Sequence, residues 1–480
     1  MTIAATRNQM FIDGEWADAA SGETVEVVNP ATEAVIGEVP KGGEADVDRA
    51  AAAARGAFEE WSQTTPGERS TMLYRFADVV ESHAAELSKV ESENVGKPKG
   101  VADFDVTFSV DNIRFFAGAA RVVEGKAAGE YTKGFTSMIR REPVGVVGQV
   151  APWNYPLMMA IWKLGPALAA GNTVVLKPSS ATPLSAIRLA ELAADIFPKG
   201  VLNVITGPGA TVGLRLVTHP EIDMVSLTGD TATGKEIAAA AAKTVKRVHL
   251  ELGGKAPVVV FDDADLGALA ESVKLAGFFN SGQDCTAATR VIASGRIYDN
   301  VLAELVPAVQ SLKVGNPADD EELDMGPLVS RSQQERVAGF VERARSDGAK
   351  LATGGATIDG GGFFYQPSVV TDVKQDSEIV QREVFGPVVT VQRFADDEEA
   401  IRWANGVPFG LAASVWTSNV KRALNAARRL RYGTVWINDH LTLASEMPHG
   451  GFGQSGYGKD MSSYSIEDYT VVKHVMAKLT

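Results

Sequence analysis

Three side chains that suit acyl-transfer chemistry stand in segments rich in glycine or proline. Cys285 is the only cysteine of the chain and follows Asn-Ser-Gly-Gln-Asp, Glu251 precedes Leu-Gly-Gly-Lys, and Asn154 lies between Pro-Trp and Tyr-Pro. A thiolate can attack a carbonyl carbon, a carboxylate can activate water, and an amide can donate to an oxyanion. Each also has a plainer interpretation: an inert buried cysteine, a helix-capping acid and an asparagine in a turn.

Motifs for metal or phosphate binding are weaker. The six histidines show no metal-ligand spacing, so we predict no metal site. Residues 229–235 have P-loop spacing, but Glu236 stands where Mg²⁺ chemistry needs Ser or Thr. Residues 451–456 match G-x-G-x-x-G, but no βαβ unit follows them. Residues 207–213 stand between a predicted strand and a predicted helix, where their amides either approach a diphosphate or form a tight turn.

Length, charge and cysteine content limit the class of protein. The chain has 480 residues, 45% hydrophobic and 22% charged, enough for a large core in two or three domains. Its net charge of −14 disfavours nucleic acid and anionic membranes as partners, since both require basic patches. A single cysteine predicts no intrachain disulfide and a cytoplasmic protein, and residues 1–7 lack the apolar core of a signal peptide.

The elements that must position these side chains follow from the apolar pattern. Between 144 and 251, short apolar runs alternate with helical segments, which predicts βαβ units around a parallel sheet. Ligands bind at the carboxyl ends of such strands, here 151–155, 177–180, 207–213, 228–234 and 251–254. The apolar run 157–176 contains Lys163 and the pairs Gly165-Pro166 and Gly171-Asn172. It therefore predicts a buried helix, a turn and a strand rather than a membrane span.

Further elements are predicted on both sides of this region. Apolar residues at helical spacing predict helices at 46–61, 66–94 and 102–120. A second α/β region is predicted from 257 to about 451, and an alternating pattern predicts a C-terminal strand at 464–475.

Seven motifs occur in the order typical of the NAD(P)-dependent aldehyde dehydrogenase superfamily, which the chain resembles over essentially its whole length. They are Pro152-Trp-Asn-Tyr-Pro, Trp162-Lys-Leu-Gly-Pro-Ala-Leu-Ala-Ala-Gly-Asn, Leu176-Lys-Pro-Ser, Thr228-Gly, Glu251-Leu-Gly-Gly-Lys, Gly282-Gln-Asp-Cys and Glu383-Val-Phe-Gly-Pro. The segments that begin at Ser445, Ser455 and Glu467, together with Asp284, resemble more narrowly the bacterial 4-aminobutyraldehyde dehydrogenases of putrescine degradation. Betaine aldehyde dehydrogenases and other aminoaldehyde dehydrogenases are close relatives of these enzymes.

The resemblance implies a mechanism and a set of catalytic residues. Cys285 is expected to attack the aldehyde carbon, Asn154 and the Cys285 backbone amide to hold the oxyanion, and Glu251 to activate the water that hydrolyses the thioester. Lys163 matches a family lysine at the domain junction, where a structural salt bridge is favoured over direct catalysis.

The resemblance also implies a site for NAD, with NADP also accepted. The residues expected to contact the coenzyme are Ala151, Pro152, Trp153, Lys177, Ser179, Ser180, Gly209, Gly213, Thr228, Gly229, Asp230, Thr231, Leu252, Glu383 and Phe385. Two positions depart from the family pattern. Ser180 replaces a glutamate found in many NAD-preferring relatives, which weakens discrimination against NADP. Asp230 replaces a common serine, and its carboxylate either opposes the diphosphate or caps the helix that follows.

An ω-aminoaldehyde carries an ammonium group, so its pocket should offer carboxylates or aromatic faces. The residues expected to contact it are Asp105, Tyr155, Met159, Trp162, Asp284 and Glu446. Asp105 is the preferred candidate because it matches an acidic residue on the substrate-tunnel helix of related aminoaldehyde dehydrogenases. The plainer interpretation of each acid is a solvated surface residue.

The fold class implied by the resemblance is α/β in three parts. A Rossmann-like NAD(P)-binding domain is expected over 1–123 and 144–253, a catalytic domain over 254–456, and a small β oligomerisation element over 124–143 and 457–480. A homotetramer is expected, with a dimer as the alternative. Two other functions stay open: a cofactor-independent esterase that uses the same cysteine and glutamate, and a binding role on a scaffold that has lost activity.

Overall fold

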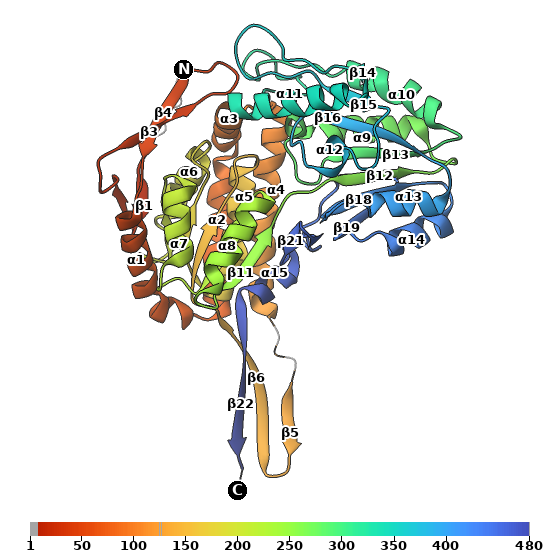
Figure 1. Ribbon diagram of the computed structural model, residues 1–480. Helices are drawn as coiled ribbons and strands as arrows, with labels where there is room; N and C mark the ends of the chain where they lie inside the picture. The colour runs from red at the N-terminus through yellow and green to blue at the C-terminus, as the bar shows by residue number, and fades with distance from the viewer. Residues whose placement is uncertain (1–7, 124, 126, 480) are drawn as a thin grey trace.

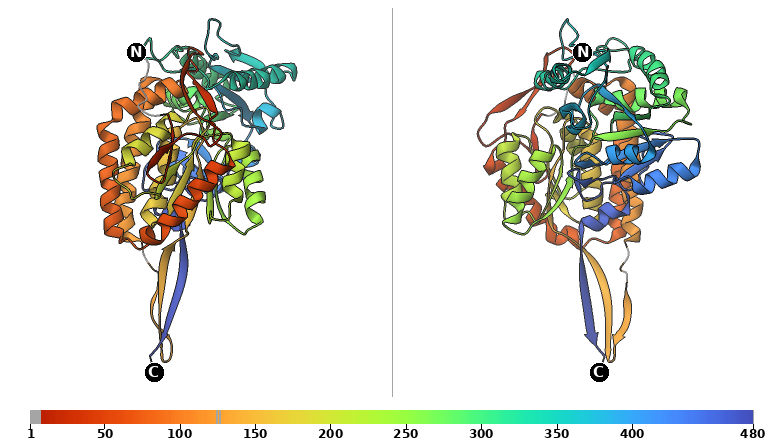
Figure 2. Two further views of the ribbon diagram at one scale, coloured as in Figure 1. Left: turned by 90° about the vertical axis from the view of Figure 1, so that its left-hand side faces the viewer. Right: turned by 45° about the vertical axis from the view of Figure 1, so that its right-hand side comes forward.

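The computed structural model describes residues 8–123, 125 and 127–479. Residues 1–7, for which the sequence predicts no signal peptide, lie outside the described residues, as do residues 124, 126 and 480 of the predicted domain spans. Two large sheets lie side by side, and a narrow three-stranded ribbon projects from the body in every view (Figures 1 and 2).

The first sheet has eight strands and carries the parallel βαβ region predicted from the sequence. In order across the sheet they are β2 (Glu15–Ala17), β1 (Met10–Ile12), β9 (Leu202–Val204), β8 (Thr173–Lys177), β7 (Val146–Val150), β10 (Met224–Thr228), β11 (Arg247–Glu251) and β21 (Gly456–Tyr457). The strands from β9 to β11 are parallel, so the segments after β7, β8, β10 and β11 meet at one edge.

Helices cover both faces of this sheet. Val146 packs in one cluster and Val147 in the other, and Val174 and Val175 divide in the same way, because successive strand residues point to opposite faces. One face is covered by α2 (Pro66–Ser82), α4 (Lys99–Ala119), α5 (Pro156–Ala170) and α6 (Leu184–Ala193), and the other by α1 (Glu44–Ser62), α7 (Leu214–Thr218) and α8 (Thr231–Ala242). Helix α3 (Ala84–Val95) packs beside α4.

The second sheet begins almost where the first one ends. Only residues 252–255 separate β11 from β12 (Ala256–Val260). The order across this sheet is β14 (Lys350–Thr353), β15 (Ser368–Thr371), β16 (Val388–Phe394), β13 (Ala288–Ser294), β12, β18 (Ala412–Trp416) and β19 (Thr434–Ile437), parallel except for β14. Its helices are α9 (Leu266–Phe278), α10 (Tyr298–Gln310), α11 (Arg331–Ser346), α12 (Glu378–Gln381), α13 (Asp397–Ala404) and α14 (Val420–Arg429).

The ribbon joins the end of the chain to a segment in its first third. Strand β22 (Thr470–Lys478) pairs with β6 (Phe135–Pro143), which pairs in turn with β5 (Ala128–Thr132). Two short pairs complete the strands: β3 (Thr24–Val28) with β4 (Val35–Pro40), and β17 (Phe409–Gly410) with β20 (Phe452–Gly453). The division into three domains at the boundaries given above stays a prediction.

The prediction of a single strand over residues 464–475 is wrong. Its first part forms helix α15 (Ser462–Asp468), and the strand starts only at Thr470. Tyr469, at the junction, is fully buried in the first core cluster, so tertiary packing overrides the local alternation.

The segment 157–176 has the predicted form of a helix, a turn and a strand. Helix α5 starts with Pro156 at its first turn and ends at Gly171, whose φ of 91° is a left-handed conformation that glycine adopts without strain. All its residues are buried, which explains why the sequence is apolar on every side. Among the described residues, no helix has the length and apolar character needed to cross a membrane.

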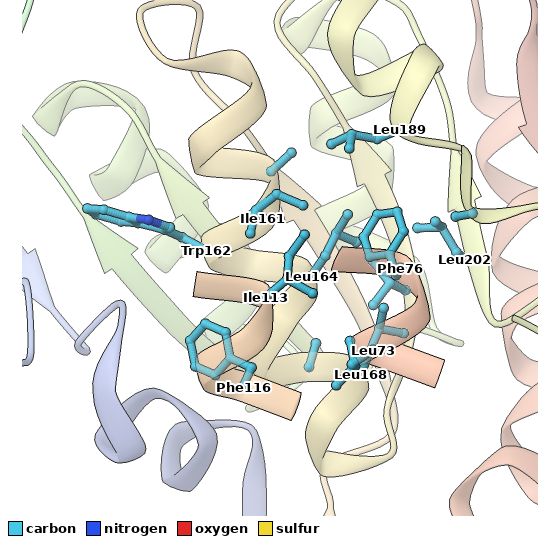
Figure 3. Close-up of a cluster of buried hydrophobic side chains, with 14 of the residues drawn as sticks. Leu73, Phe76, Ile113, Phe116, Ile161, Trp162, Leu164, Leu168, Leu189 and Leu202 are labelled. Atoms are coloured by element: carbon cyan, nitrogen blue, oxygen red, sulfur yellow. The ribbon is translucent and has the colours of Figure 1, made fainter. Parts of the chain in front are cut away.

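The core beneath the site is centred on α5. Ile161, Leu164 and Leu168 project from it against Phe76, Ile113 and Phe116, as Figure 3 shows. Gly165 has no room for a side chain, since a Cβ there would clash with the Phe116 ring. This close approach lets α5 pack tightly on α4.

Because Leu164 is 1% exposed in this cluster, Leu164→Ala should lower the free energy of unfolding by about 2–5 kcal/mol. Leu214→Ala serves as a control, because Leu214 is 52% exposed and its loss should change that free energy by less than about 0.5 kcal/mol. Urea denaturation measures both. If the free energy of unfolding fell as little in Leu164→Ala as in Leu214→Ala, this cluster would not stabilise the fold.

Candidate active site

A pocket of about 830 Å³ lies where the two sheets meet. It is bounded by the carboxyl edge of the first sheet and by loops that enter the amino edge of the second, since Cys285 precedes β13 and Glu383 precedes β16. Most of the predicted site residues line it: Ala151, Pro152, Trp153, Asn154, Tyr155, Met159, Lys177, Ser179, Ser180, Gly209, Thr228, Gly229, Asp230, Thr231, Leu252, Cys285, Glu383 and Phe385. The structure therefore brings the coenzyme candidates and the nucleophile into one cavity.

The loop before Cys285 has an unusual backbone. Asn280, Ser281 and Gly282 have φ values of 49°, 59° and 69°, three consecutive left-handed residues of which only the glycine is free of strain. Hydrogen bonds hold them there: Asn280 Nδ2 donates to Asn154 O (2.9 Å) and Ser281 Oγ to Gly326 O (2.8 Å). This sharp turn directs the partly exposed Cys285 into the pocket.

Asn154 is fixed next to the nucleophile rather than serving only as a turn residue. Its side-chain Nδ2 donates to Gln283 O at 3.0 Å, two residues before Cys285. Asn154 is buried and also lines the pocket. An amide N–H held at this position can donate to an oxyanion that forms on a carbonyl bound to Cys285.

Burial is the main cause that raises the pKa of the Cys285 thiol well above its ordinary value, and the charges of Asp284, Glu383 and Glu251 raise it further. The resting group is therefore a thiol, and its attack on a carbonyl requires removal of its proton. Because the Glu251 charge is one of these causes, its carboxylate lies close enough to Cys285 to oppose formation of the thiolate.

Glu251 ends β11 with no hydrogen-bond partner for either carboxylate oxygen among the described residues, so it does not cap a helix. Burial, followed by the charge of Asp460, raises the pKa of Glu251 well above its ordinary value. A buried carboxylate without partners and with a raised pKa is suited to take a proton from water.

A buried charged network lies behind Glu251. Lys163 Nζ lies 3.1 Å from Ser226 Oγ and 3.9 Å from Asp460 Oδ2, the salt bridge that the sequence favoured for this lysine. His249 lies between two carboxylates, with Nε2 3.1 Å from Asp460 Oδ1 and Nδ1 3.1 Å from Asp468 Oδ2. Although burial opposes it, these hydrogen bonds raise the pKa of His249 to about 9. Sequence reasoning missed His249 and Asp460 because they are 211 residues apart.

The far end of the pocket has the features of a dinucleotide site. Asp230 caps α8, with Oδ1 accepting from Ala232 N (2.9 Å) and Thr233 N (3.0 Å), which decides between the two orientations left open by the sequence. Ser180 Oγ donates to Gly207 O at 2.9 Å, and burial lowers the pKa of the neighbouring Lys177 to about 8. Thr228 Oγ1 is buried without a partner among the described residues, a polar atom that a ligand could satisfy.

Gly213 is the exception among the predicted coenzyme residues. It does not line the pocket but lies at the start of α7, buried beneath Lys177. Residues 207–213 therefore combine both interpretations given above. Gly209 lines the pocket, whereas Gly207 forms a tight turn in which a Cβ would clash with Val212.

Glu383 connects the two sheets. Its Oε1 accepts from Gly254 N at 2.7 Å, and burial raises its pKa to about 7. Gln333 and Arg336, on α11, hold the backbone of this loop through Phe385 O (2.6 Å) and Glu383 O (2.8 Å) and line the pocket. No local sequence pattern identifies them as site residues, because α11 reaches the site only through the packing of the second sheet.

The predicted role of Asp105 as the direct partner of a substrate ammonium is wrong. Asp105 is fully buried, its carboxylate is paired with Lys97, and it does not line the pocket. A carboxylate that is already paired inside the protein is not available to a ligand.

The other substrate candidates divide into two groups. Tyr155 and Met159 line the pocket, whereas Trp162 is buried 5.1 Å from His449 and Asp284 accepts a hydrogen bond from Tyr155 Oη at 2.7 Å. Glu446 is exposed on a loop that Asn112 of α4 holds through Ser445 (2.9 Å). Contact of Trp162, Asp284 or Glu446 with a substrate stays a prediction.

Comparisons with known proteins agree with this geometry. A family model described as the aldehyde dehydrogenase family matches residues 16–475. An aldehyde dehydrogenase of Emericella nidulans is 44% identical over 98% of this chain and 95% of its own length, and the betaine aldehyde dehydrogenase of Bacillus subtilis is 42% identical over 97% and 96%. The crystal structure of betaine aldehyde dehydrogenase from Staphylococcus aureus in complex with NAD⁺ superposes with a TM-score of 0.97 at 38% identity, covering 98% of this chain and 95% of that chain.

The predicted fold class and the predicted superfamily are therefore confirmed. Cys285 and Asn154 line a dinucleotide-sized pocket, and relatives match over nearly the whole chain. Glu251 does not line this pocket, but its buried carboxylate lies close enough to Cys285 to raise the pKa of the thiol. The chain belongs to the aldehyde dehydrogenase family.

Proposed function

We propose that this protein oxidises 4-aminobutyraldehyde to 4-aminobutanoate with NAD, a step of putrescine degradation. The observation that carries the dehydrogenase chemistry is that Cys285 and Asn154 line a pocket whose other end suits a dinucleotide, while the buried Glu251 carboxylate lies close enough to act on the charge of Cys285. The proposal includes the cytoplasm as its location, a homotetramer as its assembly and the three-domain division given above.

The residues of the chain divide the reaction into two halves. The Cys285 thiol loses its proton to water as its sulfur bonds to the aldehyde carbon, and the amides of Asn154 and Cys285 stabilise the negative oxygen of the thiohemiacetal. A nicotinamide coenzyme held by pocket residues such as Lys177, Ser180 and Glu383 would supply the acceptor for the hydride that leaves this carbon as the thioester forms. Glu251 then takes a proton from water as the water oxygen attacks the thioester, and cleavage of the carbon–sulfur bond returns the thiol.

The coenzyme assignment is supported by the pocket and by a solved relative that holds NAD⁺. Gly253 is suited to such a site because it has no Cβ. A Cβ at this position would clash with the Glu383 carboxylate, which lies against the backbone here. Ser180 lines the pocket without a negative charge, so it offers no repulsion to a 2′-phosphate. NAD is the proposed coenzyme, with NADP also accepted.

The substrate assignment is supported by an aromatic row that consists of Phe104, Phe108, Phe279 and Trp162. Ring centroids are 5.6 Å apart for Phe104 and Phe108, 5.9 Å for Phe104 and Phe279, and 6.4 Å for Phe108 and Trp162. Phe104 is 40% exposed and Trp162 is buried, so the row runs from the surface inwards, although none of its four residues is among those that line the pocket of Cys285. Aromatic faces attract ammonium groups.

Betaine aldehyde is the alternative substrate within the same enzyme class. Its quaternary ammonium needs aromatic faces rather than a carboxylate, and the pairing of Asp105 with Lys97 leaves that carboxylate unavailable to a ligand. A relative named betaine aldehyde dehydrogenase also favours it. A cofactor-independent esterase is the alternative outside the class, and steady turnover without NAD would identify it.

Cys285→Ala should abolish aldehyde oxidation because the chain has no other thiol, while NADH binding stays intact. Glu251→Gln should stop after the first half-reaction and give a burst of NADH with little steady turnover. Stopped-flow absorbance measures the burst, and fluorescence titration measures NADH binding. Steady turnover by Cys285→Ala near the rate of the unmodified protein would overturn the mechanism.

Ser180→Glu should raise the KM for NADP at least about tenfold, because a carboxylate near the ribose repels a 2′-phosphate. The KM for NAD should change by less than about threefold. Initial rates with both coenzymes at saturating aldehyde test this. An equal effect on both coenzymes would mean that residue 180 does not face the ribose.

Phe108→Leu should lower kcat/KM for 4-aminobutyraldehyde by about twofold to fivefold, since a cation–π contact contributes on the order of 0.5–1 kcal/mol. Butanal, an uncharged aldehyde of equal carbon number, is the matched control and should be little affected because leucine keeps the surface apolar. Initial rates with 4-aminobutyraldehyde, betaine aldehyde and butanal give the comparison. If the unmodified protein shows no preference for a charged aldehyde, the aminoaldehyde assignment is wrong.

A further inference from the structure

A buried group of three charged side chains lies behind the active site, separate from the network around Glu251. Lys97 Nζ lies 2.6 Å from Glu91 Oε2 and is also paired with Asp105. All three side chains are fully buried between α3 and α4. Burying three charges is costly, and well-packed apolar residues often replace such groups without loss of stability. The function described so far gives this group no role.

The ammonium of Lys97 also contacts the segment that carries Asn154 and Tyr155. It lies 4.7 Å from the centroid of the Tyr155 ring, over its face. Glu91, held by the same lysine, accepts from Leu157 N through Oε1 at 3.3 Å. Lys97 therefore fixes both the Tyr155 ring and the first turn of α5.

Tyr155 carries this contact to the nucleophile. Its Oη donates to Asp284 Oδ2 at 2.7 Å, and Asp284 Oδ1 accepts from Thr286 N (2.6 Å) and Thr286 Oγ1 (2.7 Å). Asp284 directly precedes Cys285, and its negative charge opposes formation of the thiolate. Each hydrogen bond to this carboxylate draws charge away from the thiol.

We propose that Lys97 is a positioning residue for Cys285: its ammonium fixes the Tyr155 ring so that the phenol hydroxyl keeps hold of the Asp284 carboxylate. Asp105 and Glu91 hold the lysine in place for this task. Without Lys97 the phenol loses its fixed position and no longer holds the Asp284 carboxylate. The negative charge of Asp284 then repels the sulfur more strongly, and the Cys285 thiolate forms less readily.

The reactivity of the single thiol provides a direct test. Alkylation of Cys285 by iodoacetamide in the full-length protein, followed by mass spectrometry across pH, needs neither aldehyde nor coenzyme, so its result does not depend on the proposed substrate. Lys97→Met should move the midpoint of this profile upwards by about half a pH unit, equivalent to about threefold slower alkylation below the midpoint.

The direction of the shift separates positioning from loosening of the structure. Burial is the main cause of the raised thiol pKa, so a variant that merely opened the site to water would move the midpoint downwards. The other carboxylates that face Cys285, Glu251 and Glu383, are unchanged in all variants. An unchanged or lowered midpoint in Lys97→Met would overturn the proposal.

A double-mutant cycle tests the route through the phenol. Tyr155→Phe keeps the ring over Lys97 but removes the hydroxyl, so it should raise the midpoint by a similar amount, and adding Lys97→Met should then have no further effect. Ser88→Ala is the matched control, because it removes a bond between α3 and α4, to Asp103, without touching Lys97, and should leave the midpoint unchanged. Additive shifts in the double variant would overturn the proposal.

Removal of a buried charge can prevent folding, so the proposal is also tested with two variants that do not remove Lys97 alone. Lys97→Met combined with Asp105→Asn removes one charge of each sign and should still raise the midpoint. Tyr155→Phe leaves Lys97, Glu91 and Asp105 paired with one another and can be measured alone. If Tyr155→Phe alkylates with the profile of the unmodified protein, Lys97 does not act on the thiol through Asp284.

Discussion

The active site depends on how closely the chain can approach itself at Gly253 and Gly254. A Cβ at Gly253 would clash with the Glu383 carboxylate, and one at Gly254 would clash with the carbonyl of Cys285. These glycines lie between the last parallel strand of one sheet and the first strand of the other. With any larger residue there, Glu251, Cys285 and Glu383 would lie further apart, since each is carried by a different strand end.

The same crowding determines the electrostatics of the thiol. Cys285 has Asp284, Glu383 and Glu251 as negative neighbours in a buried site, and all three oppose loss of its proton. The protein limits this repulsion with nearby donors rather than with a cation against the sulfur. Gly254 N binds Glu383, and Tyr155 with Thr286 binds Asp284. Two cations lie one layer further away: Lys97 over the Tyr155 ring, and Lys163 beside Ser226 and Asp460.

Local sequence determined those features that depend on neighbouring residues. The strand and helix alternation from 144 to 251 follows from apolar periodicity, and α5 follows from Pro156 and Gly171 at its ends. Cys285, Glu251 and Asn154 could be found because glycines or prolines flank them, and the ordered motifs identified the family. Asp230 was recognised as a possible cap because capping involves only the next three residues.

Tertiary structure decided what depends on residues far apart in the chain. Asp105 pairs with Lys97 because α3 and α4 pack together, and no pattern around Asp105 distinguishes this burial from exposure to a ligand. Gln333 and Arg336 reach the pocket only because α11 packs against the second sheet. Residues 462–468 are helical despite their alternating pattern, because Ile466, with Met461 and Tyr469 on either side of the helix, packs in the core around α5. Burial and charge pairing arise from contacts across the fold, so a linear sequence supplies the candidate groups while packing decides which of them face the ligand.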